Sequence, residues 1–456
     1  MSLSGLLWSP VSSIHSLLTR PSSTKLLDEK RPSYNLPLEL VSQIVALYGD
    51  DKKLLLKYSL VSRTWRGACL PFIFRNTDLQ SSTDFRRWNH IIESSPDIAR
   101  LVRRVKFCPT SSRNSDLLPP LGDSFKDIPP LPVMPGVTEL AWTPFFGHRE
   151  CTISPTPSII QFLQSFPALQ RVEIYAQFLD VRSLECFLAN CGPALKELAL
   201  HNFTLQHEPY QNGSWNSPSS YHLDTSHLDL SPLEHLVIDG ESFTSEWVVG
   251  SLFTESRPEQ LRALTVTSLY RDLPLLKSLP LINLFASSLE ALTVKTPSWT
   301  PASGPDPALE PFPSLRVLTI STDTTHVPTS RQHTIEKFLR IVQAENLTTL
   351  ELRAPVIGGS GEVINSLGDY NWKQLCGVIS KRFPRLETLV LWFMLDGYIP
   401  RRRRTKLLAK VKKRIPRSHL DGKEIRVRWS IENGFAGSCN SDCHVESESD
   451  SGSELE

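Results

Sequence analysis

The chain has 456 residues, 40% of them apolar and 21% charged, which is the ordinary balance of a globular protein. Its formal net charge of +1 excludes a global field that would recruit nucleic acid or an anionic membrane. Eight cysteines are spread thinly along the chain, and no run approaches the roughly 20 apolar residues of a membrane helix. We therefore expect an intracellular protein, cytoplasmic and/or nuclear, with reduced thiols.

The N-terminal segment, residues 1–33, is rich in serine and is predicted to be disordered. It carries Arg20 and Lys25 and has no acidic residue before Asp28, a pattern that weakly resembles an organellar transit peptide. A disordered tail is the expectation, and organellar targeting is the alternative.

The next segment, LPLELVSQIVALYGDDKKLLLKYSLVSRTWRG (36–67), has the apolar spacing of two or three short helices. Pro37 stands near the start of the first helix, Gly49 is placed to end it, and Asp50 is placed to begin the next. A helical module below about 40 residues does not usually stabilise itself. It therefore has to dock on the rest of the chain, on another protein, or on both.

From about residue 100 onward, the pattern apolar-x-x-apolar-x-apolar recurs ten times. The copies begin at Val102, Val137, Leu169, Leu195, Leu233, Leu261, Leu289, Leu315, Leu347 and Leu386, with a mean period of about 32 residues. The fourth and sixth positions of a copy point to one face of a strand. Because no copy buries that face alone, the pattern predicts stacked repeats with one continuous core.

Several segments between the copies have helical periodicity instead. They are TDFRRWNHIIESSP (83–96), TPSIIQFLQSF (156–166), SRQHTIEKFLRIV (330–342) and NWKQLCGVISKRF (371–383). In the second of these, Thr156 is the expected N-cap and Pro157 the first helical residue. Strand–helix units of this kind predict an α/β solenoid with parallel strands. Residues 207–229 and 296–311 are predicted insertions, because they are rich in Pro, Ser and Gly.

Over roughly residues 97–431, the repeats resemble the leucine-rich repeat family. The asparagine that usually follows the strand in that family is mostly absent, and the spacing between copies varies from 26 to 39 residues. The resemblance implies a leucine-rich-repeat-like solenoid, to which we assign residues 77–435.

Residues 34–76 resemble an F-box. The motif is matched by Leu36-Pro37-Leu38-Glu39-Leu40, by Ile44, and by Val61-Ser62-Arg63-Thr64-Trp65-Arg66. The resemblance implies docking on the Skp-type adaptor of an SCF (cullin–RING) ubiquitin ligase. The residues that it places in the interface are Leu36, Pro37, Leu40, Ile44, Val61 and Trp65. The alternative is that these helices only cap the first repeat.

Outward-pointing strand positions should form the floor of the solenoid. They include Glu139, Arg171, Glu173, Tyr175, Glu197, His201, His235, Asp239, Lys295, Glu351, Arg353, Thr388 and Trp392, with more acids in the N-terminal half. An exposed aromatic among polar neighbours is a typical binding hot spot. The candidate substrate-binding residues are Arg171, Tyr175, His201, Arg353 and Trp392.

Two clusters contain the side-chain types of zinc ligands. They are His222, Asp224, His227 and Asp229, and Cys439, Cys443 and His444. The first lies in a polar insertion and the second lacks a fourth ligand, so we expect no metal. GGSGE (358–362) lacks the lysine of a phosphate loop, and no nucleophile–base pair is evident. We therefore expect neither an enzyme nor a cofactor.

The basic run RRRRTKLLAKVKKRIPR (401–417) is interpreted as a helix with a solvated face, with a nuclear-import or acidic-partner site as the alternative. The acidic tail, residues 436–456, is predicted to be disordered; it is a candidate shield for the basic run or a phosphorylation site at Ser447, Ser449 or Ser451.

These patterns predict a substrate-recognition subunit of an SCF-type ubiquitin ligase. Its partners would be the adaptor, the cullin–RING ligase and an unknown protein substrate, with neither a membrane nor a nucleic acid expected. One alternative is an adaptor-independent repeat scaffold for protein–protein interaction. Another is a metal-dependent hydrolase that uses the His/Asp cluster.

Overall fold

The structure is a computed structural model. It describes residues 36–80, 82–107, 130–143, 152–153, 156–178, 181–205, 228–240, 253, 258–268, 279–296, 309–322, 328–356, 371–396, 409 and 423–432. The chain divides into two compact units. The first comprises Met1–His148, Ser154–Val172 and Asn190–Gly192, and the second comprises Arg149–Ile153, Glu173–Ala189 and Pro193–Glu456.

The first unit begins with three helices, α2 (Leu38–Leu47), α3 (Lys52–Tyr58) and α4 (Arg63–Arg75). Pro37 is the N-cap residue of α2, as expected. The residue that caps α3 is Asp51, not Asp50, because Asp51 is the one whose carboxylate accepts from the Leu54 amide, at 3.0 Å. The α4 helix continues through Pro71, which the sequence analysis did not predict.

The rest of the first unit consists of strands and helices in alternation. They are β1 (Asn76–Leu79), α5 (Ser82–Ser94), η1 (Pro96–Arg100), β2 (Arg104–Phe107), β3 (Glu139–Trp142) and α7 (Pro157–Gln164). The strands β1, β2 and β3 pair in that order and run parallel. Thr156 caps α7 by accepting from the Ile159 amide, as predicted. The core of this unit is aromatic, with the rings of Phe107 and Trp142 at 4.7 Å.

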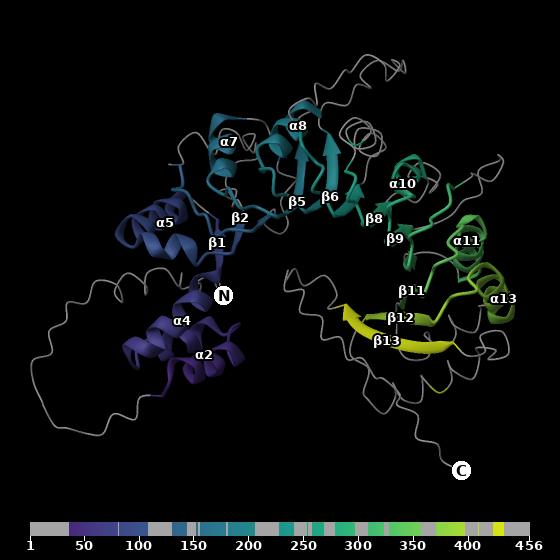
Figure 1. The fold of residues 1–456 in the computed structure, drawn as a ribbon, viewed down its shortest axis with the longest axis horizontal. Helices are drawn as coiled ribbons and strands as arrows, with labels where there is room; N and C mark the ends of the chain where they lie inside the picture. The colour runs from purple at the N-terminus through teal and green to yellow at the C-terminus, as the bar shows by residue number, and fades with distance from the viewer. Residues whose placement is uncertain are drawn as a thin grey trace, which may run out of the picture. The chain divides into compact units, whose positions relative to one another are not determined.

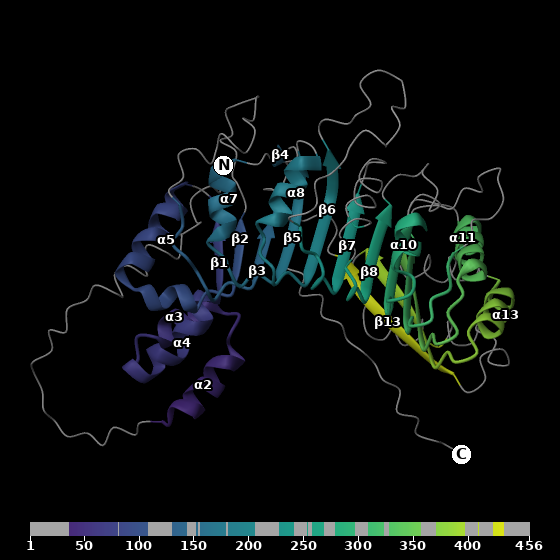
Figure 2. The same ribbon diagram turned by 45° about the horizontal axis from the view of Figure 1, so that its top comes forward.

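The second unit has the same alternation. Its elements are β4 (Thr152–Ile153), β5 (Arg171–Phe178, whose first two residues belong to the first unit), α8 (Val181–Ala189), β6 (Glu197–Leu205), β7 (His235–Gly240), β8 (Ala263–Ser268), α10 (Leu279–Phe285), β9 (Ala291–Thr296), β10 (Val317–Thr322), α11 (Pro328–Ile341), β11 (Thr349–Val356), α13 (Trp372–Arg382), β12 (Thr388–Asp396) and β13 (Glu424–Glu432). From β6 to β13, each strand pairs in parallel with the next. In this unit, α10, α11 and α13 lie along one side of the sheet (Figures 1 and 2).

The repeat motif has a backbone counterpart. The carbonyl oxygen of Glu234 accepts from the amides of Arg262 and Ala263, at 2.8 and 3.0 Å. One repeat later, the carbonyl of Arg262 accepts in the same way from Glu290 and Ala291, at 2.8 and 2.9 Å. The same arrangement recurs at the carbonyls of Arg103, Thr138, Lys196, Glu290, Arg316 and Thr348. These bonds between successive repeats fix the register of the parallel strands.

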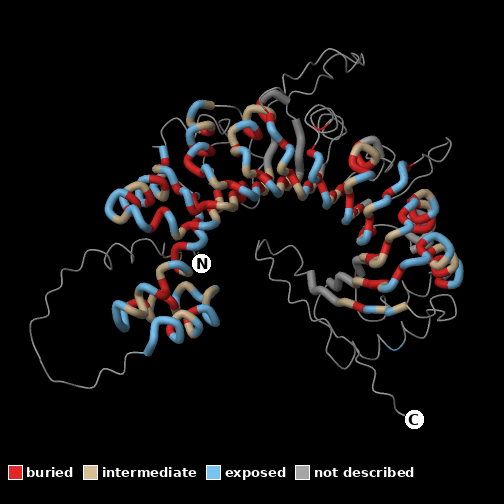
Figure 3. Tube along the Cα trace, in the orientation of Figure 1, coloured by how far each residue is buried: buried red, intermediate tan, exposed pale blue. Residues whose placement is uncertain are grey.

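Burial follows the motif as predicted. The first, fourth and sixth positions of all ten copies belong to the buried core, from Val102 at 0% exposure to Leu391 at 2%. Each of the four predicted helical segments contains a helix with a buried apolar face, such as Phe85, Trp88 and Ile91 of α5. The predicted fold class, an α/β leucine-rich-repeat-like solenoid with parallel strands, is confirmed. Figure 3 shows the buried residues recurring along the strands.

The array has strands that the motif did not reveal. The first is β1, which pairs with β2 from residues directly after α4, and the last is β13, which pairs with β12 over nine residues. One corner requires glycine: a Cβ on Gly136 would collide with the carbonyl of Arg100 and lie 2.8 Å from the carbonyl oxygen of Val102. The approach of two backbones at this corner therefore excludes any side chain.

Several sequence hypotheses concern residues outside the described ranges. These are the N-terminal segment 1–33, most of the two insertions, His222, Asp224, His227, the loop 358–362, the basic run apart from Ala409, and the tail with Cys439, Cys443 and His444.

Candidate protein-interaction surfaces

Large exposed apolar side chains are concentrated in the three N-terminal helices. Among the described residues, eight large apolar side chains are exposed, and seven of them lie between residues 36 and 61. We call these seven the apolar patch: Leu36, Leu38, Leu40, Leu47, Tyr48, Leu60 and Val61. The eighth is Val133. A group of exposed apolar side chains on one module marks an interaction site more often than singly scattered exposed leucines do.

The α2 helix has two apolar faces with different surroundings. Val41 and Val45 are buried, at 1% and 0% exposure, on the face that packs against α4. Leu40 and Leu47 lie seven residues apart, two helical turns, so they share a different face. That face is exposed, with Leu47 at 81%. Only one of the two faces of α2 therefore contributes to the core.

An aromatic chain links the ends of the three helices. The ring of Tyr58, at the end of α3, lies 6.0 Å from the ring of Tyr48 and 5.2 Å from the ring of Trp65. Tyr48 follows α2, and Trp65 stands in the first turn of α4. Leu60 and Val61, at 63% and 65% exposure, follow Tyr58 after one intervening residue, Ser59. The aromatic chain therefore brings the exposed residues at the ends of α2 and α3 to one region.

The far end of α4 attaches these helices to the repeats. Phe74 is buried, and its ring lies 6.0 Å from the ring of Trp88 in α5. Lys52 of α3 donates to the carbonyl of Asn76 in β1, at 2.8 Å. The helices thus dock on the first repeats through α4, while the apolar patch stays uncovered by the described residues of the chain.

The predicted interface residues differ in exposure. Leu36, Pro37, Leu40 and Val61 are exposed, whereas Ile44 and Trp65 are half-buried. Trp65 is partly covered because it packs on Tyr58. Leu47, the most exposed residue of the apolar patch, was not among the predicted interface residues, although its spacing from Leu40 is a helical signal.

In the second unit, polar side chains occupy the sheet face opposite the buried leucines. One group, here the acidic cluster, consists of Glu173, Tyr175, His201 and Asp239. The rings of Tyr175 and His201 stack at 4.2 Å. His201 Nε2 lies 3.8 Å from a carboxylate oxygen of Glu173, and His201 Nδ1 lies 3.6 Å from a carboxylate oxygen of Asp239. The structure thus brings together two of the candidate residues, Tyr175 and His201, while Arg171 belongs to the first unit.

A second group, here the arginine–tryptophan cluster, consists of Glu351, Arg353, Trp392 and Arg428. The Arg353 guanidinium lies 4.3 Å from the ring centroid of Trp392, and that of Arg428 lies 5.8 Å from it. Glu351 accepts from Arg353 Nη2 at 2.9 Å and from Arg428 Nη1 at 3.4 Å. Arg353 and Trp392 were predicted as binding residues from the sequence, whereas Arg428 was not, because β13 was not predicted.

Two further pairs on this sheet compensate charge, one within a strand and one at the edge of the sheet. Arg426 donates two bonds of 2.7 Å to Glu424 and thereby holds the pKa of that carboxyl below its ordinary value. At the edge where the strands begin, Lys196 bonds Glu234 at 2.8 Å and likewise lowers the pKa of that carboxyl. These exposed pairs are weak, so they serve mainly to cancel charge.

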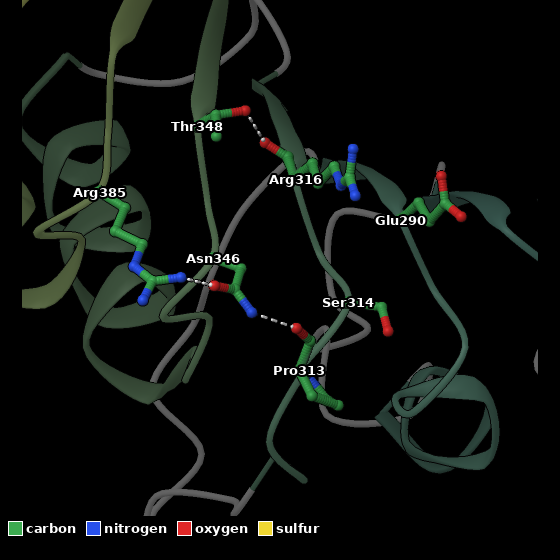
Figure 4. Close-up of a pocket in the computed structure, with 7 residues that line it drawn as sticks. All are labelled: Glu290, Pro313, Ser314, Arg316, Asn346, Thr348 and Arg385. Carbon is green, nitrogen blue, oxygen red and sulfur yellow. Dashed lines mark hydrogen bonds between the residues drawn. The ribbon is translucent and has the colours of Figure 1, made fainter.

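The second unit also has a polar pocket of about 520 Å³ where the chain enters the strands. It is lined by Glu290, Pro313, Ser314, Arg316, Asn346, Thr348 and Arg385 (Figure 4). Asn346 donates to the Pro313 carbonyl at 2.7 Å and accepts from Arg385, and Thr348 donates to the Arg316 carbonyl at 3.2 Å. Because these bonds join successive repeats, the polar groups of this pocket have structural partners already.

Comparison with known proteins adds little to this description. No protein-family model matches the chain, and no curated protein matches it. Among solved structures, the chain is similar to the leucine-rich repeat-containing protein LegL7 from Legionella pneumophila, with 14% identity over 75% of this chain and 98% of that one, and a TM-score of 0.38. The assignment of the repeat fold depends instead on the strand register and on the buried repeat positions described above.

Within the described part of the chain, no helix is long and apolar enough to cross a membrane, and no three metal-binding side chains are grouped as ligands. Leucine-rich-repeat-like solenoids typically act as non-enzymatic scaffolds whose extended surfaces bind other proteins. The fold therefore indicates a protein-interaction scaffold, and its two candidate surfaces are the apolar patch and the polar face of the second unit.

Proposed function

We propose that the chain is the substrate-recognition subunit of an SCF-type cullin–RING ubiquitin ligase. Residues 34–76 would be an F-box-like module that binds the Skp-type adaptor. Residues 77–435 would be the repeat domain that binds a protein substrate, between disordered segments at 1–33 and 436–456. The observation that carries this proposal is the apolar patch, which is exposed on helices whose sequence resembles an F-box.

The resemblance and the exposure point to overlapping residues. Leu36, Leu40 and Val61 match the motif and are exposed large apolar side chains. A helical module that merely capped the repeats would bury its apolar residues against them. The exposed side chains of this module therefore support docking of a second polypeptide rather than capping alone.

The proposed mechanism is proximity, without chemistry performed by this chain. The adaptor would tether the F-box-like module to the ligase, while the polar face of the repeats would hold the substrate. Holding a substrate lysine near a charged conjugating enzyme raises its effective concentration. The ubiquitin transfer itself would take place on other subunits.

Adaptor binding by matched valine variants tests the proposal. Val61 and Val133 are exposed to similar extents, at 65% and 61%, but only Val61 belongs to the apolar patch. The full chain is co-expressed with a Skp-type adaptor as the wild type, as Val61→Asp and as Val133→Asp. We expect the wild type and Val133→Asp to co-purify with the adaptor, and Val61→Asp to bind at least about tenfold more weakly. Leu40→Asp should behave like Val61→Asp.

Each other outcome has a defined meaning. If Val61→Asp and Leu40→Asp retain full affinity while the wild type binds, the adaptor uses another surface and the assignment of the module is wrong. If the wild-type chain does not bind the adaptor at all, the ligase proposal fails and the adaptor-independent repeat scaffold is favoured.

A further inference from the structure

We propose that the arginine–tryptophan cluster of the second unit binds a segment of a partner protein that carries glutamate or aspartate carboxylates. This inference deepens the proposed function, because it names the class of substrate that the repeat domain would take. Binding itself requires only the chain and the acidic segment, so it can be measured without the adaptor.

The strand register builds the cluster. Arg353 of β11 and Arg428 of β13 are the cross-strand neighbours of Trp392 on β12. These three strands lie side by side at the C-terminal end of the second unit (Figure 1). Parallel neighbours in register place their side chains on the same face. Two guanidinium groups therefore flank one indole ring on the side of the sheet away from the buried leucines.

The two guanidinium groups keep hydrogen-bonding capacity for a ligand. Arg353 directs Nε and Nη2 at Glu351, and Arg428 directs Nη1 at the same carboxylate. A guanidinium has five N–H donors in a planar fork. Within the described part of the chain, each arginine thus has further N–H groups that are not engaged by Glu351. Both side chains are 28% exposed, so these donors are accessible.

The charge balance of the cluster favours a carboxylate over a phosphate. Glu351, at 9% exposure, is shared by both arginines and offsets one of their two positive charges. The neighbouring Arg426 is occupied by Glu424. One bound carboxylate neutralises the remaining single positive charge, whereas a phosphate group of charge near −2 would leave one negative charge uncompensated beside Glu351. Bidentate pairing of Arg with carboxylate adds geometric specificity.

The negative charge at the opposite end of the same unit should repel an acidic segment and so favour its binding at this cluster. Glu173, Glu197 and Asp239 give the sheet face from β5 to β7 a negative charge. Like charges oppose binding there. Lys295 on β9 is exposed and adds a positive charge on the side of the sheet face that also carries Arg353 and Arg428. An acidic segment is therefore attracted to β9–β13 and repelled from β5–β7.

Fluorescence anisotropy with labelled peptides tests the inference on the purified full chain. The probes are an eight-residue peptide of alternating Glu and Gly, the same peptide with Gln for Glu, and the same peptide with phosphoserine for Glu. We expect the Glu peptide to bind, and the Gln and phosphoserine peptides to bind at least about tenfold more weakly. Raising the salt concentration should weaken binding of the Glu peptide.

Variants locate the site. Arg428→Gln leaves Glu351 paired with Arg353, so the fold is kept, and it should weaken binding of the Glu peptide by about tenfold or more. The matched control is Arg262→Gln, which removes an exposed arginine that lies beside Glu290, at 3.9 Å, at the edge of the same sheet. This control should bind like the wild type. Glu351→Gln should bind more tightly, a gain that a folding defect does not produce.

Several results would overturn the inference. One is that the Glu peptide does not bind up to about 1 mM. Others are that Arg428→Gln and Arg262→Gln weaken binding of the Glu peptide equally, or that Glu351→Gln binds this peptide more weakly than the wild type. The last is that the phosphoserine peptide or a single-stranded oligonucleotide binds more tightly than the Glu peptide. Because the adaptor is absent from this assay, failure here leaves the valine-variant test of the ligase proposal untouched. Likewise, failure of the valine-variant test leaves the result of the peptide assay valid.

Discussion

Truncation of two leucines in the N-terminal helices tests whether the apolar patch is uncovered. Leu47 and Leu55 are both helical leucines, but Leu47 is 81% exposed and Leu55 is 0% exposed. Complete burial of a leucine is worth about 1.5–3 kcal/mol, and Leu47 realises only about a fifth of that within this chain. Leu47→Ala should therefore change the free energy of unfolding of the module by about 0.5 kcal/mol or less, whereas Leu55→Ala should cost about 2–5 kcal/mol.

Hydrogen exchange of the backbone amides in α3 and α4 measures this difference locally, without assuming that the whole chain unfolds in one step. Since about 1.4 kcal/mol corresponds to a factor of ten, Leu55→Ala should accelerate exchange by at least about 20-fold. Leu47→Ala should change it by no more than about threefold. If the two variants accelerate exchange equally, Leu47 is covered by the chain itself, and the reasoning from the apolar patch is wrong.

The same side chain should matter more to a partner than to the fold. A partner that covered the exposed part of Leu47 would gain about 1–2 kcal/mol. Leu47→Ala should therefore weaken adaptor binding by about tenfold at almost unchanged stability. Isothermal titration with the purified adaptor measures this affinity, and an unchanged dissociation constant would remove Leu47 from the proposed interface.

Three further predictions concern the repeats and α4. Gly136→Ala should lower the free energy of unfolding by about 1–3 kcal/mol, because its Cβ meets backbone. Gly67→Ala in α4 should raise it by about 0.5–1 kcal/mol, because an added Cβ there meets no atom within 4 Å outside the adjacent helix backbone. Urea denaturation compares the two variants. Burial raises the pKa of the Cys376 thiol to about 11. The folded state therefore favours the protonated thiol, so the contribution of Cys376 to stability is complete below the pKa of an unfolded thiol and is lost as the pH rises toward 11. At pH of about 8, iodoacetamide should label Cys376 only after unfolding, and rapid native labelling would contradict its burial. The Glu234 carboxyl should titrate below its ordinary range, because it is paired with Lys196. The contribution of this pair to stability is therefore lost as the pH falls through the lowered pKa. Lys196→Gln should move the pKa of Glu234 back upward, which an NMR titration measures.

The sequence was informative where a residue pattern is compatible with only one local structure, such as a strand with one buried face or the start of a helix. An apolar residue at alternate positions of a strand has to face the core, so the burial of Leu350 and Leu352 was predictable from the motif alone. The same holds for α7, where Thr156 and Pro157 mark the start of the helix before any contact is known. The absence of the usual asparagine did not prevent the repeats from stacking, because the backbone carbonyls of the corners set the register.

The sites were predictable only in part. Trp392 and Arg353 were identified as binding candidates from their outward strand positions, but their contact depends on the pairing of β11 with β12 across 39 residues of chain. Arg428 entered the cluster through β13, which carries no complete copy of the repeat motif. Long-range pairing of this kind is decided by stacking of whole repeats, which no local pattern encodes.

By itself, the sequence determined that the chain forms strand–helix repeats and which residues form their core, since burial of apolar residues follows from periodicity. It also identified the helices before the repeats as a module with more apolar surface than it can bury. Only the tertiary structure decided which of those apolar residues stay exposed. Val45 and Leu47 are two residues apart and equally apolar, yet the first faces α4 and the second faces outward, because packing of α2 on α4 selects one face of the helix and leaves the other uncovered.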